Sequence, residues 1–503
     1  MSSATVVGSG PNGLAAAAKL ARAGLDVTVL EASDTIGGGT RSSEMIIPGL
    51  VHDHCSAFHP IAAASPFLNG LDLASDGLRW LQPAVDCAHP LDDGSAGVLY
   101  RSIERTVDGM GRDGERWRRV FGPMVSRFDD LFADASQPVL RVPRHPLVLA
   151  RFGAAAVLPA TALVGLWRTE AVRALWAGIA AHTCHRLDRP MTSAVGLMLI
   201  AAGHAKGWVV AEGGSQAIAK ALVADIERHG GVIETGQLVA SPGDLPPSDV
   251  LMLDVSPSIA ADILGDRLPG RVARSYRRFR HGLAAFKVDF AVAEGVPWTA
   301  PAARQAGTVH LGGRFDEVVA NEQAVHRGRM PGRPFVLVGQ QYLADQTRSV
   351  GNIHPVWAYA HVPAAYSGDA TAAIITQIER FAPGFRERII GTAVRSATEM
   401  SIYNANYVGG DILGGSASPV QLLFRPRLAV DPYFTGISGV YLCSASTPPG
   451  AGAHGMCGAN AADRALARLG GRRPARAAPR GRLRRVAHQL SVETSVDSDQ
   501  ESG

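Results

Sequence analysis

The chain has 503 residues, of which 46% are hydrophobic and 19% are charged, so it can bury one large core and has room for two. Its 49 basic and 45 acidic residues leave a net charge of +4, a balance that predicts no nucleic-acid groove. The five cysteines form no Cys-x-x-Cys pair, which predicts reduced thiols in a cytoplasmic protein without a metal or a redox disulfide: Cys55, Cys87, Cys184, Cys443 and Cys457.

The first motif spans residues 5–31, where an apolar run breaks into Gly-x-Gly-x-x-Gly and a second β-branched run ends on an acid. Because the first strand already starts near residue 5, we expect no signal peptide. The order strand, turn, helix, strand and acid predicts a dinucleotide site, with the pyrophosphate at the helix N-terminus and the acid on the ribose. The predicted cofactor contacts here are Gly8, Gly10, Pro11, Asn12, Gly13 and Glu31.

The residues after Glu31 extend this motif and favour FAD over NAD. The segments TIGGGTRS (35–42) and PGLVHD (48–53) resemble the double-glycine extension of the glutathione-reductase-like flavoproteins, which include amine oxidases and carotenoid desaturases. In those families the extension lies over the diphosphate and the flavin, and an Arg usually follows Gly-Gly directly. Here Gly39 takes that place, a variant that resembles the carotenoid-desaturase relatives. The resemblance adds Gly37, Gly38, Gly39, Thr40 and Arg41 to the predicted FAD contacts.

Residues 70–205 are predicted to be mostly helical, with amphipathic segments at 115–131 and 170–181, and to form part of a substrate domain. The apolar stretch 147–167 is interrupted by Arg151 and Pro159, so a membrane-spanning helix is not expected. Two interpretations remain for it: buried helices of the second domain, or an apolar surface that docks on a bilayer to collect a lipid-like substrate.

The chain is then predicted to return to the nucleotide domain. Residues 212–239 resemble the flavoprotein segment that leads back to a strand at the adenine, so a strand is expected from 231 to about 239 and Val239 is a candidate for backbone contacts to that ring. A further strand of the same sheet is expected at 251–255.

A strand predicted at 286–292 carries Lys287, which stands 11 residues before Trp298. This spacing resembles that of the flavin amine oxidases, in which a lysine on a comparable strand holds a water against flavin N5. Such a lysine would be catalytic, as a cationic donor beside the reacting atoms. The alternative is an edge-strand lysine whose stem lies on the sheet while its ammonium reaches water.

Three polar-aromatic segments, at 345–348, 354–363 and 404–411, resemble the phytoene dehydrogenase-like family of carotenoid and retinoid oxidoreductases. Trp357, Tyr359 and His361 alternate on one predicted strand, where they would line an apolar tunnel or simply pack on a half-buried sheet.

The last motif is a predicted buried strand at 439–447 followed by a helix that opens within 448–460 and runs to about residue 469. In the related families this unit closes the FAD site, and its helix N-terminus faces the flavin N1/O2 edge. It supplies Ser444, Gly455 and Met456 as predicted FAD contacts, and His454 as a catalytic candidate or a structural loop histidine. Residues 472–503 hold seven arginines and few apolar side chains, which predicts disorder.

Together these patterns predict an α/β protein, a glutathione-reductase-like, Rossmann-like FAD-binding domain (1–70, 205–274 and 426–471) interleaved with an α+β substrate domain (71–204 and 275–425). The resemblance implies a FAD-dependent dehydrogenase or desaturase that transfers hydride from an apolar, isoprenoid-like small molecule to flavin N5. An amine oxidase that uses Lys287 and a flavin-binding regulatory protein with little turnover remain alternatives. Since no second Gly-x-Gly-x-x-Gly unit is found, electrons are expected to pass to oxygen, a quinone or a protein, and a peripheral membrane contact remains open.

Overall fold

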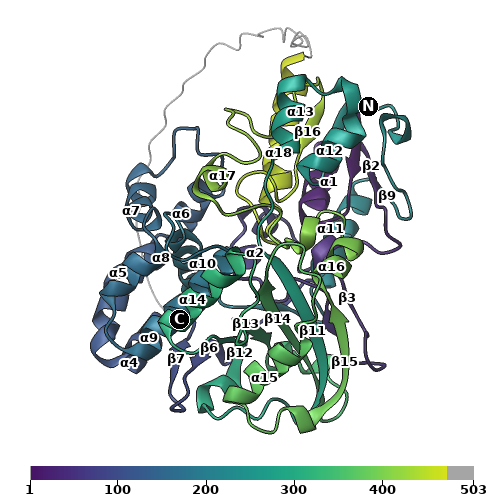
Figure 1. The fold of residues 1–503 in the computed structure, drawn as a ribbon. Helices are drawn as coiled ribbons and strands as arrows, with labels where there is room; N and C mark the ends of the chain where they lie inside the picture. The colour runs from purple at the N-terminus through teal and green to yellow at the C-terminus, as the bar shows by residue number, and fades with distance from the viewer. Residues whose placement is uncertain (1, 473–503) are drawn as a thin grey trace, which may run out of the picture.

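The computed structural model describes residues 2–472, and the fold is built on two large sheets (Figure 1). The first has five parallel strands in the order β16 (Val440–Leu442), β10 (Val250–Leu253), β1 (Ser3–Val7), β2 (Asp26–Leu30) and β9 (Val232–Glu234). Three segments far apart in the sequence therefore build one sheet. Its strands are short apolar runs because helices cover both of its faces.

Alternate side chains of this sheet face two different helical layers. Val6, Val29 and Met252 pack into a cluster with α1 (Pro11–Arg22), α11 (Gln216–Arg228) and α18 (Met456–Arg472). Val7 and Leu253 point the other way, into a cluster with α12 (Pro257–Leu264) and α13 (Gly270–Arg277). The result is a doubly covered Rossmann-like layer, so the predicted α/β fold class is confirmed.

The second sheet has seven strands, and its neighbours pair antiparallel except for β12 and β6. Its order is β15 (Ile389–Arg395), β11 (Ala284–Ala293), β14 (Ile353–Val362), β13 (Val336–Gly339), β12 (Ala306–Leu311), β6 (Val85–Pro90) and β7 (Ala96–Leu99). One face packs on α15 (Thr371–Phe381) through Phe286, Val288 and Phe290. On the other face, Trp357 and Tyr359 belong to a buried apolar cluster that also contains side chains of the neighbouring helices.

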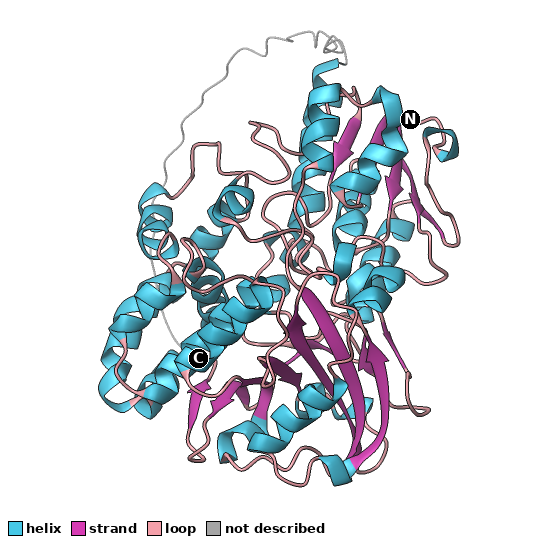
Figure 2. Ribbon diagram, in the orientation of Figure 1, coloured by secondary structure: helices cyan, strands magenta, loops and turns pink. Residues whose placement is uncertain are grey.

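Figure 2 shows that most of the remaining helices gather on one side of this sheet. The other helices described are α2 (Pro60–Ala63), α3 (Pro66–Asn69), α4 (Ile103–Gly109), α5 (Gly114–Ser126), α6 (Phe128–Ala135), α7 (Pro146–Ala156), α8 (Ala160–Leu163), α9 (Glu170–Ala180), α10 (Ser193–Lys206), α14 (Phe315–His326), α16 (Ala397–Tyr403) and α17 (Pro419–Leu423). Two short ribbons complete the described part, β3 (Ser42–Ser43) with β4 (His52–Asp53) and β5 (Trp80–Leu81) with β8 (Val210–Ala211).

The structure corrects several predicted elements. The segment 70–205 is mostly helical, as predicted, but it also contains β5 and the hairpin of β6 and β7, which extends the second sheet. A short apolar run in a sequence does not by itself distinguish a strand from a buried helix. The strand expected to reach residue 239 ends at Glu234, since its partner β2 ends at Leu30 and the chain turns at Gly236, which has φ +69°. The strands expected at 251–255 and 439–447 are Val250–Leu253 and Val440–Leu442, and α18 continues past the two glycines to Arg472.

The strands of the first sheet lie within the three ranges predicted for the FAD-binding domain, and those of the second sheet within the ranges predicted for the substrate domain. The domain boundaries themselves stay a prediction. The predicted disorder of 472–503 lies almost wholly outside the described residues.

Within residues 2–472, the structure has no single helix with the length and apolarity needed to cross a bilayer. One pair of helical segments, Pro146–Ala156 with Ala160–Leu166, meets that test only when taken together, and the two are bent by 90°.

Candidate active site

The glycine-rich turn joins β1 to α1 and leaves the N-terminus of that helix open to an anion. We call this turn (residues 8–13), together with the double-glycine extension (residues 37–41) that packs on it, the cradle. Gly8 adopts φ +100°, and a Cβ on Gly13 would stand 2.1 Å from the Gly8 carbonyl oxygen. Pro11 occupies the first helical position, so the free amides of this end belong to the residues that follow it. The Oδ1 atom of Asn12 is buried and has no hydrogen-bond partner within the described chain. An unpartnered polar atom beside a helix N-terminus fits a dinucleotide pyrophosphate.

Glu31 follows β2 and holds the turn and the extension together. Its carboxylate accepts hydrogen bonds from the Ser9 amide at 2.9 Å and the Ser9 hydroxyl at 2.5 Å, and from the Ser33 amide at 2.9 Å. The Arg41 guanidinium lies 3.2 Å from Glu31 Oε1, and both side chains are buried. This arrangement places the predicted ribose-binding acid and Arg41 in one ion pair.

The double-glycine extension packs directly on the first turn. A Cβ on Gly38 would lie 3.1 Å from the Gly10 Cα, and one on Gly39 would lie 2.1 Å from the Tyr407 hydroxyl oxygen. Thr40 Oγ1 donates to the Gly37 carbonyl, and the Tyr403 hydroxyl donates to the Gly38 carbonyl at 2.7 Å. Glycine is therefore required here for the extension to pack closely on the turn, and a glycine-rich backbone held at a helix N-terminus fits the diphosphate of FAD. The sequence did not indicate that Tyr403 and Tyr407 cover this loop.

The C-terminal unit reaches the same place from the other side of α1. Gly455 lies beside Ala15, its virtual Cβ 2.8 Å from that side chain, and Met456 begins α18. His454 is buried and its Nδ1 accepts the Met456 amide at 3.0 Å, while burial lowers its pKa to about 4. This neutral imidazole therefore caps α18, and the catalytic role of His454 stays a prediction. Ser444 follows β16 in a tight turn, with its carbonyl accepting from Thr447.

Val239 takes no part in the hydrogen bonds described above for the turn and the extension. Its side chain is buried in the cluster that contains Val7, Leu30 and Leu253, under the carboxyl ends of the first sheet. The predicted adenine contact through its backbone stays a prediction.

Lys287 is brought to the edge of the cradle. It is buried on β11 in an ion pair with Asp289, and its charge interacts with Cys55, whose neighbour Ser56 donates to the Gly39 carbonyl at 3.0 Å. Burial lowers the pKa of Lys287, and Asp289 opposes that shift. The sequence spacing predicted Trp298 as the tryptophan beside Lys287. This prediction is wrong, because Trp298 packs on the opposite face of the sheet. Trp357 stands there instead, its ring 5.9 Å from the Lys287 ammonium.

Asp254 is a residue beside the cradle that the sequence analysis missed. It follows β10, and its Oδ2 accepts the Gly13 amide at 2.8 Å, at the N-terminus of α1. A Cβ on Gly10 would stand 2.7 Å from the same oxygen. Burial raises the pKa of Asp254 to about 7, the Gly13 hydrogen bond opposes this, and Glu31 adds to it. Its only sequence signal was its position one residue after a buried parallel strand.

We expect this carboxyl to make the affinity for FAD dependent on pH. Above a pKa of about 7, a charged Asp254 would compete with the pyrophosphate for the same helix N-terminus, so we expect the affinity to fall as pH rises from 6 to 8, by about 10-fold. Asp254→Asn should remove most of that dependence while keeping the amide interaction. Equilibrium titration of the deflavinated protein with FAD measures both, and equal pH slopes in the two proteins would contradict the prediction.

Among the described residues, no group of three or more His, Cys, Asp or Glu side chains has the arrangement of a metal site.

Comparison with known proteins agrees with this geometry. Residues 6–69 match the family described as "NAD(P)-binding Rossmann-like domain". The chain is 24% identical to pyridine nucleotide-disulfide oxidoreductase domain-containing protein 2 of Rattus norvegicus, over 91% of this chain and 92% of that protein. It is 28% identical to hydroxyneurosporene desaturase of Cereibacter sphaeroides, over 52% and 58%.

The fold is also similar to that of a solved putrescine oxidase double mutant, with a TM-score of 0.60 at 18% identity, over 94% of this chain and 99% of that one. The predictions of an enzyme and of FAD as cofactor are thereby confirmed. The chain thus carries an NAD(P)-binding Rossmann-like domain at residues 6–69, and it is homologous to pyridine nucleotide-disulfide oxidoreductase domain-containing protein 2 over most of its length and to hydroxyneurosporene desaturase over about half of it.

Proposed function

We propose that this protein is a FAD-dependent dehydrogenase that forms a carbon–carbon double bond in a small, apolar, isoprenoid-like substrate. The observation that carries this proposal is the large buried apolar cluster that includes residues just after the extension and residues of the second sheet. This cluster runs from Ala57 and Ala64, just after the extension, through Leu197 and Ile200 of α10 to Tyr359 of β14. A substrate held there loses its water to aliphatic and aromatic side chains, which favours hydrocarbon over a charged molecule.

The residues that would hold FAD are those of the cradle, and bound FAD supplies a hydride acceptor at flavin N5. The protein's contribution is to orient the substrate against that position and to exclude water. Trp357 and Tyr359 lie with their rings 5.0 Å apart at right angles, a packing that fixes both rings on the sheet face. The desaturase homologue supports carbon–carbon dehydrogenation as the reaction class.

A second candidate, amine oxidation, is favoured by the position of Lys287 beside the cradle and by the fold shared with putrescine oxidase. An anaerobic titration separates the two by following the flavin absorbance of the holoprotein with an acyclic isoprenoid hydrocarbon in detergent and with a primary amine. Bleaching by the hydrocarbon alone supports the dehydrogenase. Bleaching by the amine, abolished in Lys287→Met, overturns it in favour of the oxidase. A flavin that neither compound reduces would favour a binding protein with little turnover.

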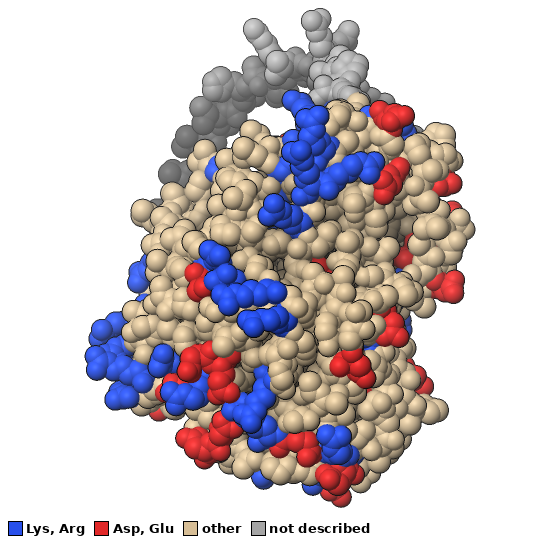
Figure 3. Space-filling view, viewed as in Figure 1, with Lys and Arg blue, Asp and Glu red and all other residues tan. Residues whose placement is uncertain are grey.

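The protein is further proposed to lie in the cytoplasm and to collect its substrate from a membrane surface. Large apolar side chains on and around α7 are exposed, among them Val142 at 89% and Leu147 at 85%. Residues 135–169 contain four arginines and no acid, so this face is also suited to anionic headgroups. The surface over α7 and α17 is mostly uncharged in Figure 3.

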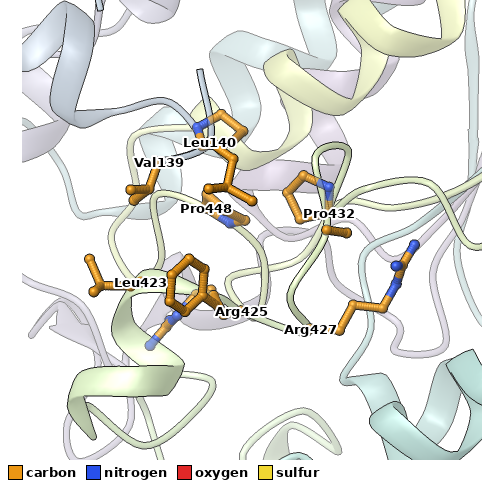
Figure 4. A pocket seen from close by; sticks show the side chains of 10 residues that line it. Val139, Leu140, Leu423, Arg425, Arg427, Pro432 and Pro448 are labelled. Atoms are coloured by element: carbon orange, nitrogen blue, oxygen red, sulfur yellow. The ribbon is translucent and has the colours of Figure 1, made fainter. Parts of the chain in front are cut away.

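A pocket joins this face to a second exposed apolar segment, as Figure 4 shows with Val139 and Leu140 opposite Leu423. The second segment includes Leu428 and Val430, which are 69% and 73% exposed. The segment around residue 140 and the segment around residue 428 therefore meet at this pocket.

Vesicle flotation tests this contact. The protein is expected to float with vesicles that contain an anionic phospholipid, and Val142→Glu combined with Leu147→Glu should reduce the bound fraction several-fold at high salt, where arginine contacts are screened. Ile390→Glu is the matched control, because Ile390 is 56% exposed on β15, away from this face. Equal flotation of both variants would contradict the proposal.

A further inference from the structure

A buried cysteine, histidine and glutamate form a connected row in the substrate half of the molecule. The Cys184 Sγ lies 3.5 Å from His361 Nε2, and His361 Nδ1 lies 2.7 Å from Glu322 Oε1. They come from three elements: the end of a 3₁₀ turn after α9, strand β14 and helix α14. The proposed function does not use these three side chains, and a thiol, an imidazole and a carboxylate in this order are the parts of an activated nucleophile or base.

The backbone at Cys184 is held in an uncommon conformation. Cys184 has φ +47° and ψ +44°, the left-handed region that a side chain with a Cβ adopts at a cost. Its amide donates to the Ala181 carbonyl at 2.8 Å, which closes the turn and aims the thiol at His361. Strain kept at a reactive side chain is typical of functional positions.

The surroundings favour a charged His361. Burial lowers its pKa, but Cys184 and Glu322 outweigh burial and hold the pKa of His361 well above its usual value. The other titratable groups that face it are Tyr359, whose pKa burial raises, and His182 and His310, whose pKa values burial lowers. These three are therefore neutral near pH 7, so Cys184 and Glu322 are the groups that raise the pKa of His361.

Two contact paths lead from Cys184 to the cradle. In the strand register, Tyr359 pairs with Lys287, and its ring lies 5.7 Å from that of His361, so the row is one side chain beyond Lys287 on the same sheet face. On the other side, Leu413 packs against the small cluster that contains Cys184, and the next residue, Gly414, lies against Ala445 in the loop after β16. Cys184 thus lies between the second sheet and the C-terminal loop predicted to contact FAD.

We propose that Cys184, His361 and Glu322 form a hydrogen-bonded triad in which His361 takes the proton of the Cys184 thiol, and that the Cys184 sulfur is then the base that takes the proton from the substrate. This rests on the proposed dehydrogenation. One C–H bond of the substrate breaks and gives its hydrogen to FAD as hydride, and the neighbouring C–H bond breaks and gives its proton to the sulfur. The electron pair of the second bond becomes the new carbon–carbon π bond, and the thiolate becomes a thiol. Glu322 acts as a positioning residue that holds the imidazolium.

The first test needs no substrate. The ultraviolet thiolate absorbance of the full chain is titrated with pH, as a difference between the natural protein and Cys184→Ser, so that the flavin signal cancels. We expect a thiolate at neutral pH that Cys184→Ser abolishes and that Glu322→Gln shifts to higher pH, because the imidazolium loses its carboxylate. Cys87→Ala is the matched control, since burial raises the pKa of the Cys87 thiol well above its usual value. A silent difference spectrum at neutral pH would overturn the triad.

The second test follows flavin reduction by rapid mixing with the isoprenoid hydrocarbon. Cys184→Ser should slow reduction about 100-fold or more with FAD binding unchanged, whereas Cys87→Ala should leave the rate unchanged. An unchanged rate in Cys184→Ser, with a thiolate present in the natural protein, would overturn its role as the base. A natural protein that the hydrocarbon does not reduce would refute the proposed dehydrogenation, while the thiolate titration still decides whether the triad exists.

Discussion

Replacement of Gly458 by alanine is expected to destabilise the protein by roughly 3 kcal/mol and to weaken FAD binding with it. Gly458 lies in α18 where that helix crosses α1, and a Cβ there would stand 1.7 Å from the Asn12 carbonyl oxygen and 2.9 Å from the Ala16 amide nitrogen. Both obstacles are backbone atoms, so α1 has to move, and its N-terminus is the predicted pyrophosphate site. Denaturant unfolding and FAD titration of the same samples measure the two effects.

Gly470→Ala in the same helix is the matched control. Nothing lies within 4 Å of the position that its Cβ would take, so the substitution should stabilise α18 by about 0.5–1 kcal/mol through the higher helix propensity of alanine. If Gly458→Ala were as stable as Gly470→Ala and bound FAD equally well, the close helix crossing that frames the cradle would be wrong.

The strand, turn and helix around the glycine motif were predictable from the sequence because their physical requirements are local. The turn, the helix start and the acid after β2 all fall within residues 5–31, and the glycine spacing itself encodes the close backbone approach. The same holds for the double-glycine extension, which packs on Gly10 at short range. The local structure of such motifs therefore depends little on contacts with distant parts of the chain.

The contacts that the sequence could not predict are those between distant segments. Asp254 reaches Gly13 across 241 residues, and Tyr407 covers Gly39 from a loop after α16. The spacing of Lys287 to Trp298 indicated a lysine–tryptophan pair, but the two side chains face opposite sides of the sheet, and Trp357 on the adjacent strand takes the place. The pairing of strands determines which side chains become neighbours in a sheet, and the spacing of residues along the sequence does not predict that pairing.

The row of Cys184, His361 and Glu322 illustrates the same limit more strongly. The sequence offered a widely spaced cysteine and a histidine on an aromatic strand, and neither pattern predicts the other. Only the packing of α14 over β14 brings a carboxylate to the imidazole. Catalytic groups that three elements contribute become visible once the tertiary structure is known.

Replacement of Arg348 by methionine should cost about 3–5 kcal/mol of unfolding free energy, the largest loss that we expect from a single substitution outside the cradle. Arg348 is fully buried. Its guanidinium contacts Asp53 at 2.5 Å and Asp345 at 3.0 Å, and it donates to the Ala211 carbonyl at 2.6 Å. It thereby ties β4 of the extension and the returning segment to the second sheet. Without it, two buried carboxylates lose their cation.

The pH dependence of stability should change sign in this variant. In the natural protein, burial raises the pKa values of Asp53 and Asp345. Arg348 and local hydrogen bonds lower these pKa values by a larger amount, so both net pKa values lie below the usual value. Their contribution is present above the unfolded pKa of about 3.9 and is lost as pH falls through the folded pKa. In Arg348→Met, burial would raise both values, so stability should increase on acidification from pH 7 to 5. Urea unfolding at several pH values measures this reversal.

Two controls separate this ion cluster from simple loss of packing. Asp53→Asn and Asp345→Asn added to Arg348→Met should recover part of the lost stability and flatten the pH dependence, because no unpaired charge then remains buried. Arg314→Met removes an exposed pair with Glu170 at 3.5 Å and should change stability by no more than about 0.5 kcal/mol. If Arg348→Met behaved like Arg314→Met, the extension would not be fastened through Arg348, and the cradle would have to be held by the packing of α1 and α18 alone.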